Sequence, residues 1–350
     1  MIRATRFLRE ALRKGSPALL RSSGQHNPSE APGERLTRAL FPLLIVAALV
    51  AAACGAETSR PAAGTTTPIT GEATFPVTVE AANGEVRIER YPERIVSLSP
   101  TATEMLFAIG AGDQVVAVDD DSNYPPEAPM TDLSGYEPNV EAIAEFDPDL
   151  VVISNDPGDL EKSLEALDIP VILQPAAESL DDTYTQIEQL GVATGHVTEA
   201  AELVGSMKSK IQRLVASSPT FDHPLTYYHE LDQTYYTATS NTFIGRIYGL
   251  LGLRNIADPA KGAASGYPQL SAEYIINADP DVVFLADTNC CGQSAATVAE
   301  RPGWDQIAAV KTGTVVGLDD DIASRWGPRV VDYLEVVVRA LSRLHQGVSS

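Results

Sequence analysis

Two segments of the chain repeat the same pattern of polar and apolar positions. Residues 141–153 (EAIAEFDPDLVVI) and 273–285 (EYIINADPDVVFL) each contain Glu, an Ile two positions later, the tripeptide Asp-Pro-Asp and then four apolar residues. The second copy begins 132 positions after the first. This repeat predicts two lobes of similar design.

Each copy predicts a turn of helix followed by a buried strand. Asn139 and Ser271 are suitable N-caps, and they place Glu141 and Glu273 in the first turn, where the helix dipole favours a carboxylate. The proline of Asp-Pro-Asp ends the helix, because it offers no N–H and restricts the residue before it. The uninterrupted apolar runs 150–153 and 282–285 are typical of parallel strands covered on both faces.

The rest of each lobe follows the same alternation of strands and helices. In the first lobe, Asn83-Gly84 predicts a hairpin within 75–91, and Ser99 with Pro100 predicts a helix start. The other first-lobe elements are strands 95–98, 114–118 and 170–174 and helix 158–167. The second lobe is expected to contain strands 225–229, 235–238 and 314–318 and helices 242–251 and 328–344. The expected fold class is α/β, with two similar lobes, each a parallel-rich sheet flanked by helices.

Residues 179–218 carry an apolar stripe at helical spacing between the lobes. Gly191 and Gly195 are expected to break this segment into two helices, the second starting at Thr198. A helix of about 18 residues spans roughly 27 Å. It would join the lobes as a stiff rod and limit their hinge motion.

The N-terminal region predicts an exported, lipid-anchored protein. Residues 39–53 are an uncharged apolar run preceded by Arg35 and Arg38, as in a signal peptide. The run ends at Cys54-Gly55 and resembles a bacterial lipobox, with Ala51 where Leu is usual, so Cys54 is the expected lipidation site. The expected divisions are the signal region 1–53, a disordered tether 54–75, an N-terminal lobe 76–178, the interlobe helix 179–218 and a C-terminal lobe 219–350.

The charge of the chain restricts its partners. The first 54 residues hold eight Lys and Arg and three Asp and Glu, so the remainder carries 17 basic against 44 acidic residues. This excess of acid argues against a nucleic-acid partner. Neutral or cationic ligands are easier to accommodate than polyanions.

Two cysteines remain after Cys54, and they are adjacent. Cys290 and Cys291 could form a vicinal disulfide or stay as thiols, and neither state joins distant segments. A redox role, a contact to a metallated ligand and simple loop packing all stay open, with packing favoured.

Four motifs together resemble the substrate-binding proteins of bacterial ABC importers for cobalamin, iron-siderophores and haem. They are RIVSLSPTATE at 94–104, PNVEAI at 138–143, SAEYI at 271–275 and RPGWDQIAAVKTG at 301–313. The resemblance covers residues 94–344 and implies an ABC permease and its ATPase as partners. It also implies a monomer held at the extracytoplasmic face of the cell membrane.

The resemblance implies roles for two glutamates. In that class one glutamate of each lobe pairs with arginines of the permease, and Glu141 and Glu273 occupy the matching positions. The duplication independently places them symmetrically. They are expected to lie away from the ligand cleft, which in this class is between the two lobes. The alternative is that each carboxylate only stabilises its own helix, by a few tenths of a kcal/mol.

The resemblance also implies the ligand-binding residues. Tyr124, Tyr136 and Tyr267 match aromatic positions of cobalamin-binding members, and Arg325 matches a cleft arginine. The expected ligand is a cobalamin-type corrinoid, with a ferric siderophore or haem next. The alternative for each of these tyrosines is ordinary packing. Other residues that could line the cleft are Tyr227, Tyr228, Glu230, Tyr235 and Trp326.

An exported enzyme and a free-metal binder are the competing interpretations. The chain has no G-x-S-x-G, H-E-x-x-H or P-loop motif, and its five histidines lack metal-ligand spacing. His229 and Glu230, adjacent on an expected strand, should face opposite sides. No catalytic residue, protein cofactor or metal ligand is therefore predicted.

Overall fold

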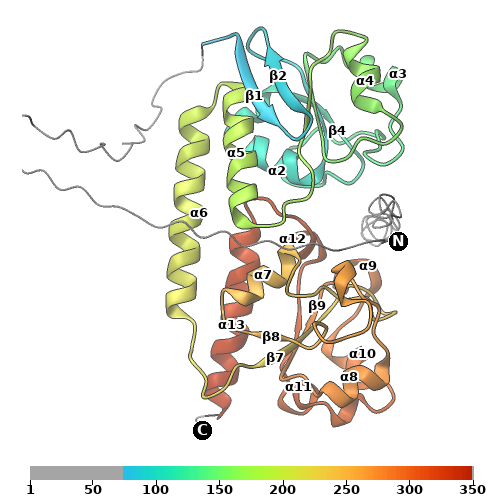
Figure 1. The fold of residues 1–350 in the computed structure, drawn as a ribbon, viewed down its shortest axis with the longest axis vertical. Helices are drawn as coiled ribbons and strands as arrows, with labels where there is room; N and C mark the ends of the chain where they lie inside the picture. The colour runs from blue at the N-terminus through green and yellow to red at the C-terminus, as the bar shows by residue number, and fades with distance from the viewer. Residues whose placement is uncertain (1–73, 349–350) are drawn as a thin grey trace, which may run out of the picture. The chain divides into compact units, whose positions relative to one another are not determined.

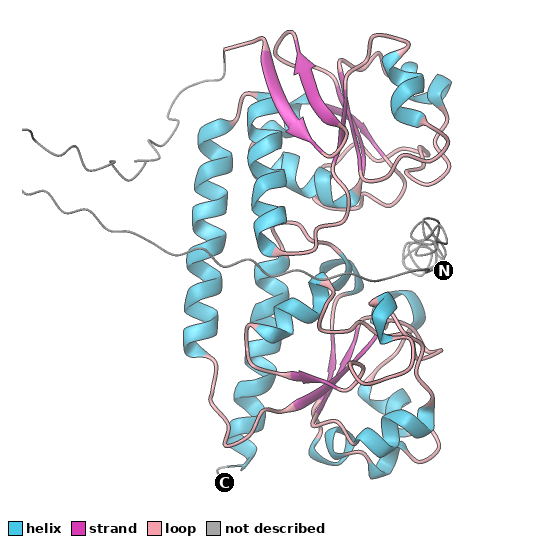
Figure 2. Ribbon diagram, in the orientation of Figure 1, coloured by secondary structure: helices cyan, strands magenta, loops and turns pink. Residues whose placement is uncertain are grey.

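The computed structural model describes residues 74–348, which form two lobes, each with a four-stranded parallel sheet (Figure 1). The predicted signal region, Cys54 and nearly all of the predicted tether lie outside the described residues. None of the helices in the described part has the length and apolar character needed to cross a bilayer. The strands lie at the centre of each lobe with helices around them (Figure 2).

The N-terminal lobe is built on the strand order β4-β3-β5-β6, with all neighbours parallel. The predicted hairpin is confirmed as a separate two-stranded sheet, and its turn residues are Ala82 and Asn83, one position earlier than Asn83-Gly84, since Gly84 pairs with Ala81. The strands are β1 (Val77–Ala81), β2 (Gly84–Ile88), β3 (Ile95–Leu98), β4 (Val115–Val118), β5 (Leu150–Ile153) and β6 (Val171–Leu173). The helices are α2 (Pro100–Ala108), the 3-10 turn η1 (Ala111–Gln114), α3 (Val140–Ala144) and α4 (Leu160–Glu165).

The C-terminal lobe has the strand order β10-β9-β7-β8, again parallel throughout. Its strands are β7 (Thr226–Glu230), β8 (Arg254–Asn255), β9 (Val282–Leu285) and β10 (Val315–Gly317). Its longer helices are α7 (Phe243–Gly249), α8 (Ala272–Ala278) and α13 (Val330–Val348). Its shorter helical segments are η2 (Ala263–Ser265), α9 (Thr288–Cys291), α10 (Ala295–Ala299), η3 (Trp304–Gln306), α11 (Ala308–Thr312) and α12 (Asp320–Ser324).

The duplicated Asp-Pro-Asp segments have the same local geometry in both lobes. Asp147 and Asp279 both adopt the left-handed conformation, with φ of 48° and 46°, which turns the chain from helix to strand. The second aspartate then receives the first N–H groups of the neighbouring strand. Asp149 accepts from the backbone of Arg94 at 2.9 Å, and Asp281 accepts from Thr226 at 2.7 Å. The motif therefore joins adjacent parallel strands at their amino ends.

The central strands are buried on both faces, which explains their uninterrupted apolar sequence. Val282 and Phe284 pack into the core cluster that includes the long helices, whereas Val283 and Leu285 pack into a second cluster under the outer helices. Strand β5 divides its four side chains in the same way. The fold class predicted from the sequence is confirmed.

Two long helices follow the N-terminal lobe; the break predicted at Gly195 is confirmed, whereas the one predicted at Gly191 is wrong, because Gly191 lies inside α5. Helix α5 (Leu180–Thr194) ends at Gly195, whose φ of 82° is left-handed, and α6 (Val197–Ser217) begins two residues later. Helix α6 lies against both α5 and α13 (Figure 1). With 21 residues it spans about 32 Å, so it reaches from the N-terminal lobe along the final helix of the C-terminal lobe.

The predicted strand 235–238 is wrong. Only Tyr236 forms a bridge, to Gln269, and Tyr235 has a φ of 70° that no strand residue adopts. The backbone N–H groups of Thr237 and Thr239 instead donate to Pro268 and Gly266. Apolar alternation here reflects a loop packed on another loop.

Candidate functional site

Two Ser-Gly-Tyr tripeptides carry the predicted ligand tyrosines at equivalent places in the two lobes. In each, the backbone N–H of the tyrosine donates to the serine hydroxyl two residues earlier, at 3.3 Å: Tyr136 to Ser134, and Tyr267 to Ser265. The sequence repeat described above covers only the helix and strand that follow these tripeptides. The repeated tripeptide was visible in the sequence, 131 positions apart.

Both tyrosine loops lie at the carboxyl ends of parallel strands. A Cβ on Gly135 would come within 2.7 Å of the Leu98 carbonyl oxygen and 2.8 Å of an Asp119 carboxylate oxygen, so only glycine fits over β3 and β4. In the C-terminal lobe, Gly266 accepts a hydrogen bond from Thr239, after β7. Ligands of parallel α/β sheets bind at this edge. The loops therefore occupy the place where a ligand contact is expected.

The three tyrosines differ in exposure. Tyr124 is 42% exposed and follows β4, and the guanidinium of Arg329 lies 4.1 Å from its ring centre. Tyr136 is half-buried. Tyr267 is also half-buried, and burial raises the pKa of its hydroxyl. All three are on loops that follow the carboxyl ends of strands, and their ligand contacts remain predictions.

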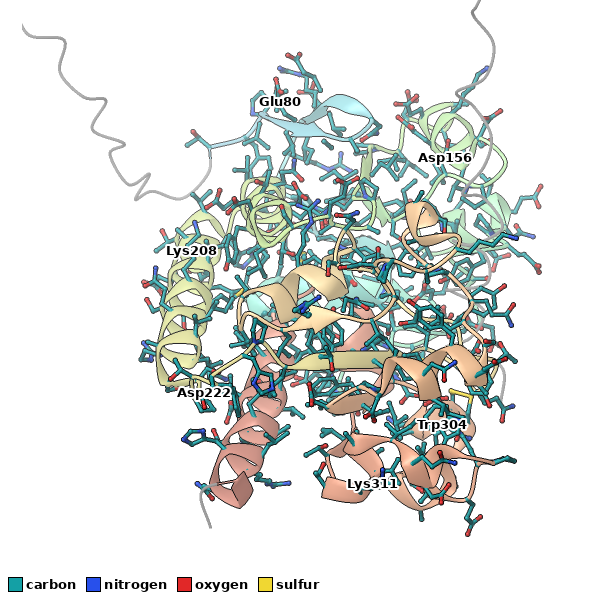
Figure 3. All side chains as sticks on the ribbon, turned by 60° about the horizontal axis from the view of Figure 1, so that its bottom comes forward. Glu80, Asp156, Lys208, Asp222, Trp304 and Lys311 are labelled. Atoms are coloured by element: carbon teal, nitrogen blue, oxygen red, sulfur yellow. A yellow bond between two sulfur atoms is a disulfide. The ribbon has the colours of Figure 1, made fainter. Side chains whose placement is uncertain are left out.

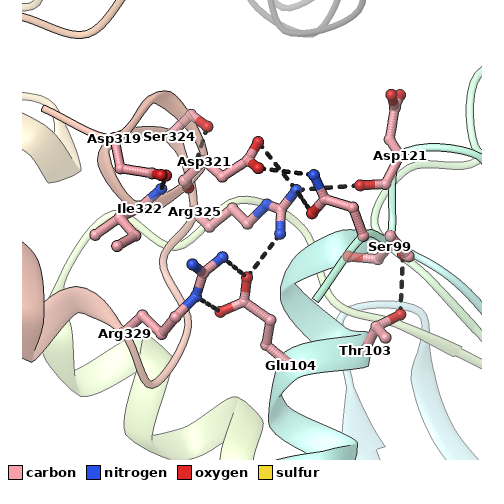
Figure 4. Close-up of polar contacts among 12 residues, drawn as sticks. Ser99, Thr103, Glu104, Asp121, Asp319, Asp321, Ile322, Ser324, Arg325 and Arg329 are labelled. Atoms are coloured by element: carbon pink, nitrogen blue, oxygen red, sulfur yellow. Dashed lines mark hydrogen bonds and ion pairs between the residues drawn. The ribbon is translucent and has the colours of Figure 1, made fainter. Parts of the chain in front are cut away.

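Arg325 is bound within the protein rather than presented alone to a ligand (Figure 4). Its guanidinium donates to Glu104 of α2 and to Asn123, each at 2.8 Å, and pairs with Asp321 at 3.1 Å. Arg329 binds both carboxylate oxygens of Glu104. Glu104 is 3% exposed, so one buried carboxylate of the N-terminal lobe holds two arginines of the C-terminal lobe. The ligand role predicted for Arg325 stays a prediction, and its observed contacts join the lobes.

Further polar contacts join the lobes beside this cluster. Thr183 of α5 donates to the backbone carbonyl of Trp326 at 2.9 Å, and the Trp326 indole N–H donates to Gln186, also at 2.9 Å. Trp326 is 6% exposed, and Tyr227 and Tyr228 are at most 1% exposed. These three further cleft candidates are core residues.

Glu141 and Glu273 are exposed in the first turns of α3 and α8. The predicted N-caps form, since Asn139 accepts from Ala142 at 3.0 Å and Ser271 accepts from Tyr274 at 3.1 Å. Each carboxylate is thus carried by the same capped turn in its own lobe. Their docking role is not tested by this geometry.

Comparison with known proteins decides the family. A family model described as periplasmic binding protein matches residues 95–322. The uncharacterized ABC transporter substrate-binding lipoprotein YvrC of Bacillus subtilis is 31% identical, over 86% of this chain and 96% of its own. The chain belongs to the periplasmic binding protein family. Its relatives include ABC transporter substrate-binding, cobalamin-binding and vitamin B12-binding proteins.

Two further similarities concern cobalamin. The cobalamin-binding protein of Halobacterium salinarum is 34% identical to this binding protein, over 74% of this chain and 72% of its own. The crystal structure of the periplasmic vitamin B12 binding protein BtuF of Vibrio cholerae superposes with a TM-score of 0.59 at 26% identity. The superposition covers 71% of this chain and 98% of the BtuF chain.

The C-terminal lobe of the binding protein contains a buried acidic cluster that the sequence did not reveal. Glu230 on β7 is fully buried and binds Arg301 through two hydrogen bonds of 2.6 Å. Asp287, at the end of the neighbouring strand β9, is also fully buried, and neither of its carboxylate oxygens has a hydrogen-bond partner. Asp320 accepts the first N–H groups of α9, from Thr288 to Cys290.

Burial raises the pKa of the Asp287 carboxyl to about 8, and the negative charge of Glu230 adds to this, against the opposing effect of Arg301. The folded pKa is above the ordinary value of 3.8, so the folded state holds a proton that the unfolded state loses. Stability should therefore fall as pH rises from about 4 to about 8. With Asp287 protonated, Arg301 has one buried carboxylate of this pair to neutralise, that of Glu230.

Replacing Asp287 with asparagine should remove this pH dependence. Asparagine keeps a donor but never ionises, so Asp287→Asn should melt at a higher temperature than the wild type at pH 8, with the gap closing towards pH 4. Each kcal/mol of relieved repulsion is worth about 3 °C. Thermal unfolding from pH 4 to 9 measures it, with exposed Asp305→Asn as the control. Melting temperatures of Asp287→Asn and the wild type that differ by the same amount at every pH would contradict the raised pKa of Asp287.

Cys290 and Cys291 form a disulfide within α9. It is visible as the yellow bond near Trp304 in Figure 3. Arg301 lies over the Trp304 ring, 4.6 Å from its centre, and binds Glu230, while the backbone N–H of Cys290 donates to Asp320. The disulfide therefore joins adjacent residues of a helix that contacts Asp320 and joins no distant segments.

His229 and Glu230 lie on opposite faces of β7, as the sequence predicted. His229 faces Tyr248, with 2.8 Å between its Nδ1 and the hydroxyl oxygen, while Glu230 faces Arg301 on the other side of β7. In residues 74–348, no group of three or more His, Cys, Asp or Glu side chains is arranged to hold a metal ion.

Proposed function

We propose that this binding protein captures a corrinoid of the cobalamin type outside the cytoplasm and delivers it to an ABC permease. The observation that carries the proposal is the pair of Ser-Gly-Tyr loops, one at the carboxyl end of each parallel sheet. Tyrosine offers a flat apolar face and a polar edge, which suits a large ligand that is apolar in part and bears amide groups. The cobalamin-binding relative supports the same ligand.

A ligand panel tests the proposal. The purified protein should be titrated with cyanocobalamin, cobinamide, ferric hydroxamates, haem and free metal ions. The corrinoids should bind most tightly. Binding of ferric siderophores or haem alone would contradict the corrinoid assignment and keep the class, and binding of free metal ions alone would support the free-metal alternative. Turnover of any of these compounds would contradict a role in binding only.

We also propose that Cys54 anchors the protein to the outer face of the cell membrane. The support is the apolar run 39–53 before a Cys-Gly pair, and the lipoprotein named among the relatives. Two buried acyl chains suffice for stable anchoring. Metabolic labelling with a fatty acid should mark the wild type and leave Cys54→Ser unlabelled. Equal labelling of both would refute the anchor.

A further inference from the structure

The loops that follow the carboxyl ends of the strands carry a one-sided charge. We define these strand-end loops as residues 119–139, 154–159, 174–179, 231–242, 256–271, 286–294 and 318–329. They contain 15 Asp and Glu and only three Lys and Arg, which are Lys261, Arg325 and Arg329. None of the three cations is in the N-terminal lobe. The predicted ligand tyrosines are all on these loops.

The two arginines offset little of this charge, because Glu104, which lies outside the strand-end loops, neutralises one of them. Both bind the buried carboxylate of Glu104, which comes from α2, and Arg325 also pairs with Asp321. An anionic ligand could recruit either guanidinium only by leaving Glu104 buried without its partners. Breaking a buried ion pair in this way is unfavourable. Of the cations on the strand-end loops, Lys261 alone stands outside the Glu104 cluster.

The acidic side chains stand on both sides of the lobe boundary. Asp120 follows β4 in the N-terminal lobe and Asp321 follows β10 in the C-terminal lobe, and both are half-buried. Asn123 donates to Asp321 at 2.8 Å, so these two loops contact each other directly. Asp119, at the end of β4 beside Asp120, is 2% exposed and has one carboxylate oxygen without a partner. A ligand on the Tyr124 loop therefore lies close to carboxylates from both lobes.

We propose that the strand-end loops select metal chelates by charge, accepting neutral or cationic chelates and rejecting polyanionic ones. This rests on the proposed function and narrows its ligand class. Neutral corrinoids and neutral or cationic ferric hydroxamates are inside the class. Haem, with two propionates, and ferric tricatecholates are outside it.

A matched pair of corrinoids tests the selection. Cyanocobalamin and a monocarboxylate derivative, in which one amide of the corrin ring has become a carboxylate, have nearly the same shape and differ by one negative charge. At low ionic strength the carboxylate should bind on the order of fivefold more weakly. The difference should shrink when salt is raised to 0.15 M and above, because the Debye length falls to about 8 Å. A purely steric effect would not respond to salt.

Variants identify the residues responsible. The double variant Asp120→Asn, Asp321→Asn should reduce the difference in affinity between the two corrinoids. Glu127 is an exposed acid on the Tyr124 loop, and Glu127→Gln should reduce this difference less. Glu202→Gln on α6 removes the same charge far from these loops in the sequence and should leave the difference unchanged. Equal or tighter binding of the monocarboxylate corrinoid at low salt would overturn charge selection and leave the proposed function standing. Binding of no chelate would overturn the proposed function, and charge selection with it.

Discussion

Replacing Glu104 with alanine should lower the free energy of unfolding by about 3–5 kcal/mol, the usual loss when one partner of a buried ion pair is removed. Glu104 is 3% exposed and is the shared acceptor for Arg325 and Arg329. Alanine would remove the carboxylate that both guanidinium groups bind at the boundary of the lobes.

Denaturant unfolding of purified protein measures the effect. Glu89→Ala is the matched control, since Glu89 pairs with Arg87 on the surface and its removal should leave the unfolding midpoint nearly unchanged. Glu104→Gln, which keeps the shape and loses the charge, should be intermediate. A loss below 1 kcal/mol for Glu104→Ala would show that the two arginines find other acceptors.

Reversing the charge of both Glu141 and Glu273 to lysine should abolish ligand uptake by cells while the affinity of the purified protein for its ligand stays the same. The two carboxylates are exposed on equivalent capped turns, where arginines of a permease can reach them. Opposed lysines would repel those arginines, and like charges across an interface cost several kcal/mol. Each single reversal should reduce uptake less than the pair.

A second pair of glutamates controls for net charge. Glu188 and Glu202 are exposed on the long helices, so reversing both changes the charge of the protein equally. That variant should transport normally. Normal uptake by the Glu141 and Glu273 double variant would refute docking through these residues, and lost ligand affinity would show that they act at the ligand site.

The duplicated segments made most of the fold predictable. Helix caps at Asn139 and Ser271 and the apolar runs of β5 and β9 depend on residues adjacent in the sequence, and these predictions are confirmed. The break at Gly195 is likewise local. In contrast, the segment 235–238 has the local pattern of a strand, and its conformation is decided by the distant loop of Gly266.

The ionic contacts of the candidate site were not predictable. Arg325 was predicted as a ligand contact, and its partner Glu104 lies 221 positions earlier in the chain. Asp287 carries no motif, and only the adjacency of β7 and β9 brings it beside Glu230. Charges of this kind are paired by topology, so a sequence pattern shows that they exist and does not show which group neutralises them.

The affinity of the purified protein for cyanocobalamin, measured for the wild type and for tyrosine variants, tests the central claim most directly. Wild-type protein should bind, and Tyr136→Ala and Tyr267→Ala should each weaken binding by about tenfold, which corresponds to loss of one aromatic contact of roughly 1.4 kcal/mol. Tyr91→Ala, an exposed tyrosine outside the strand-end loops, should bind like the wild type. Unchanged affinity in both loop variants, or no binding of cyanocobalamin by the wild type, would contradict the assignment.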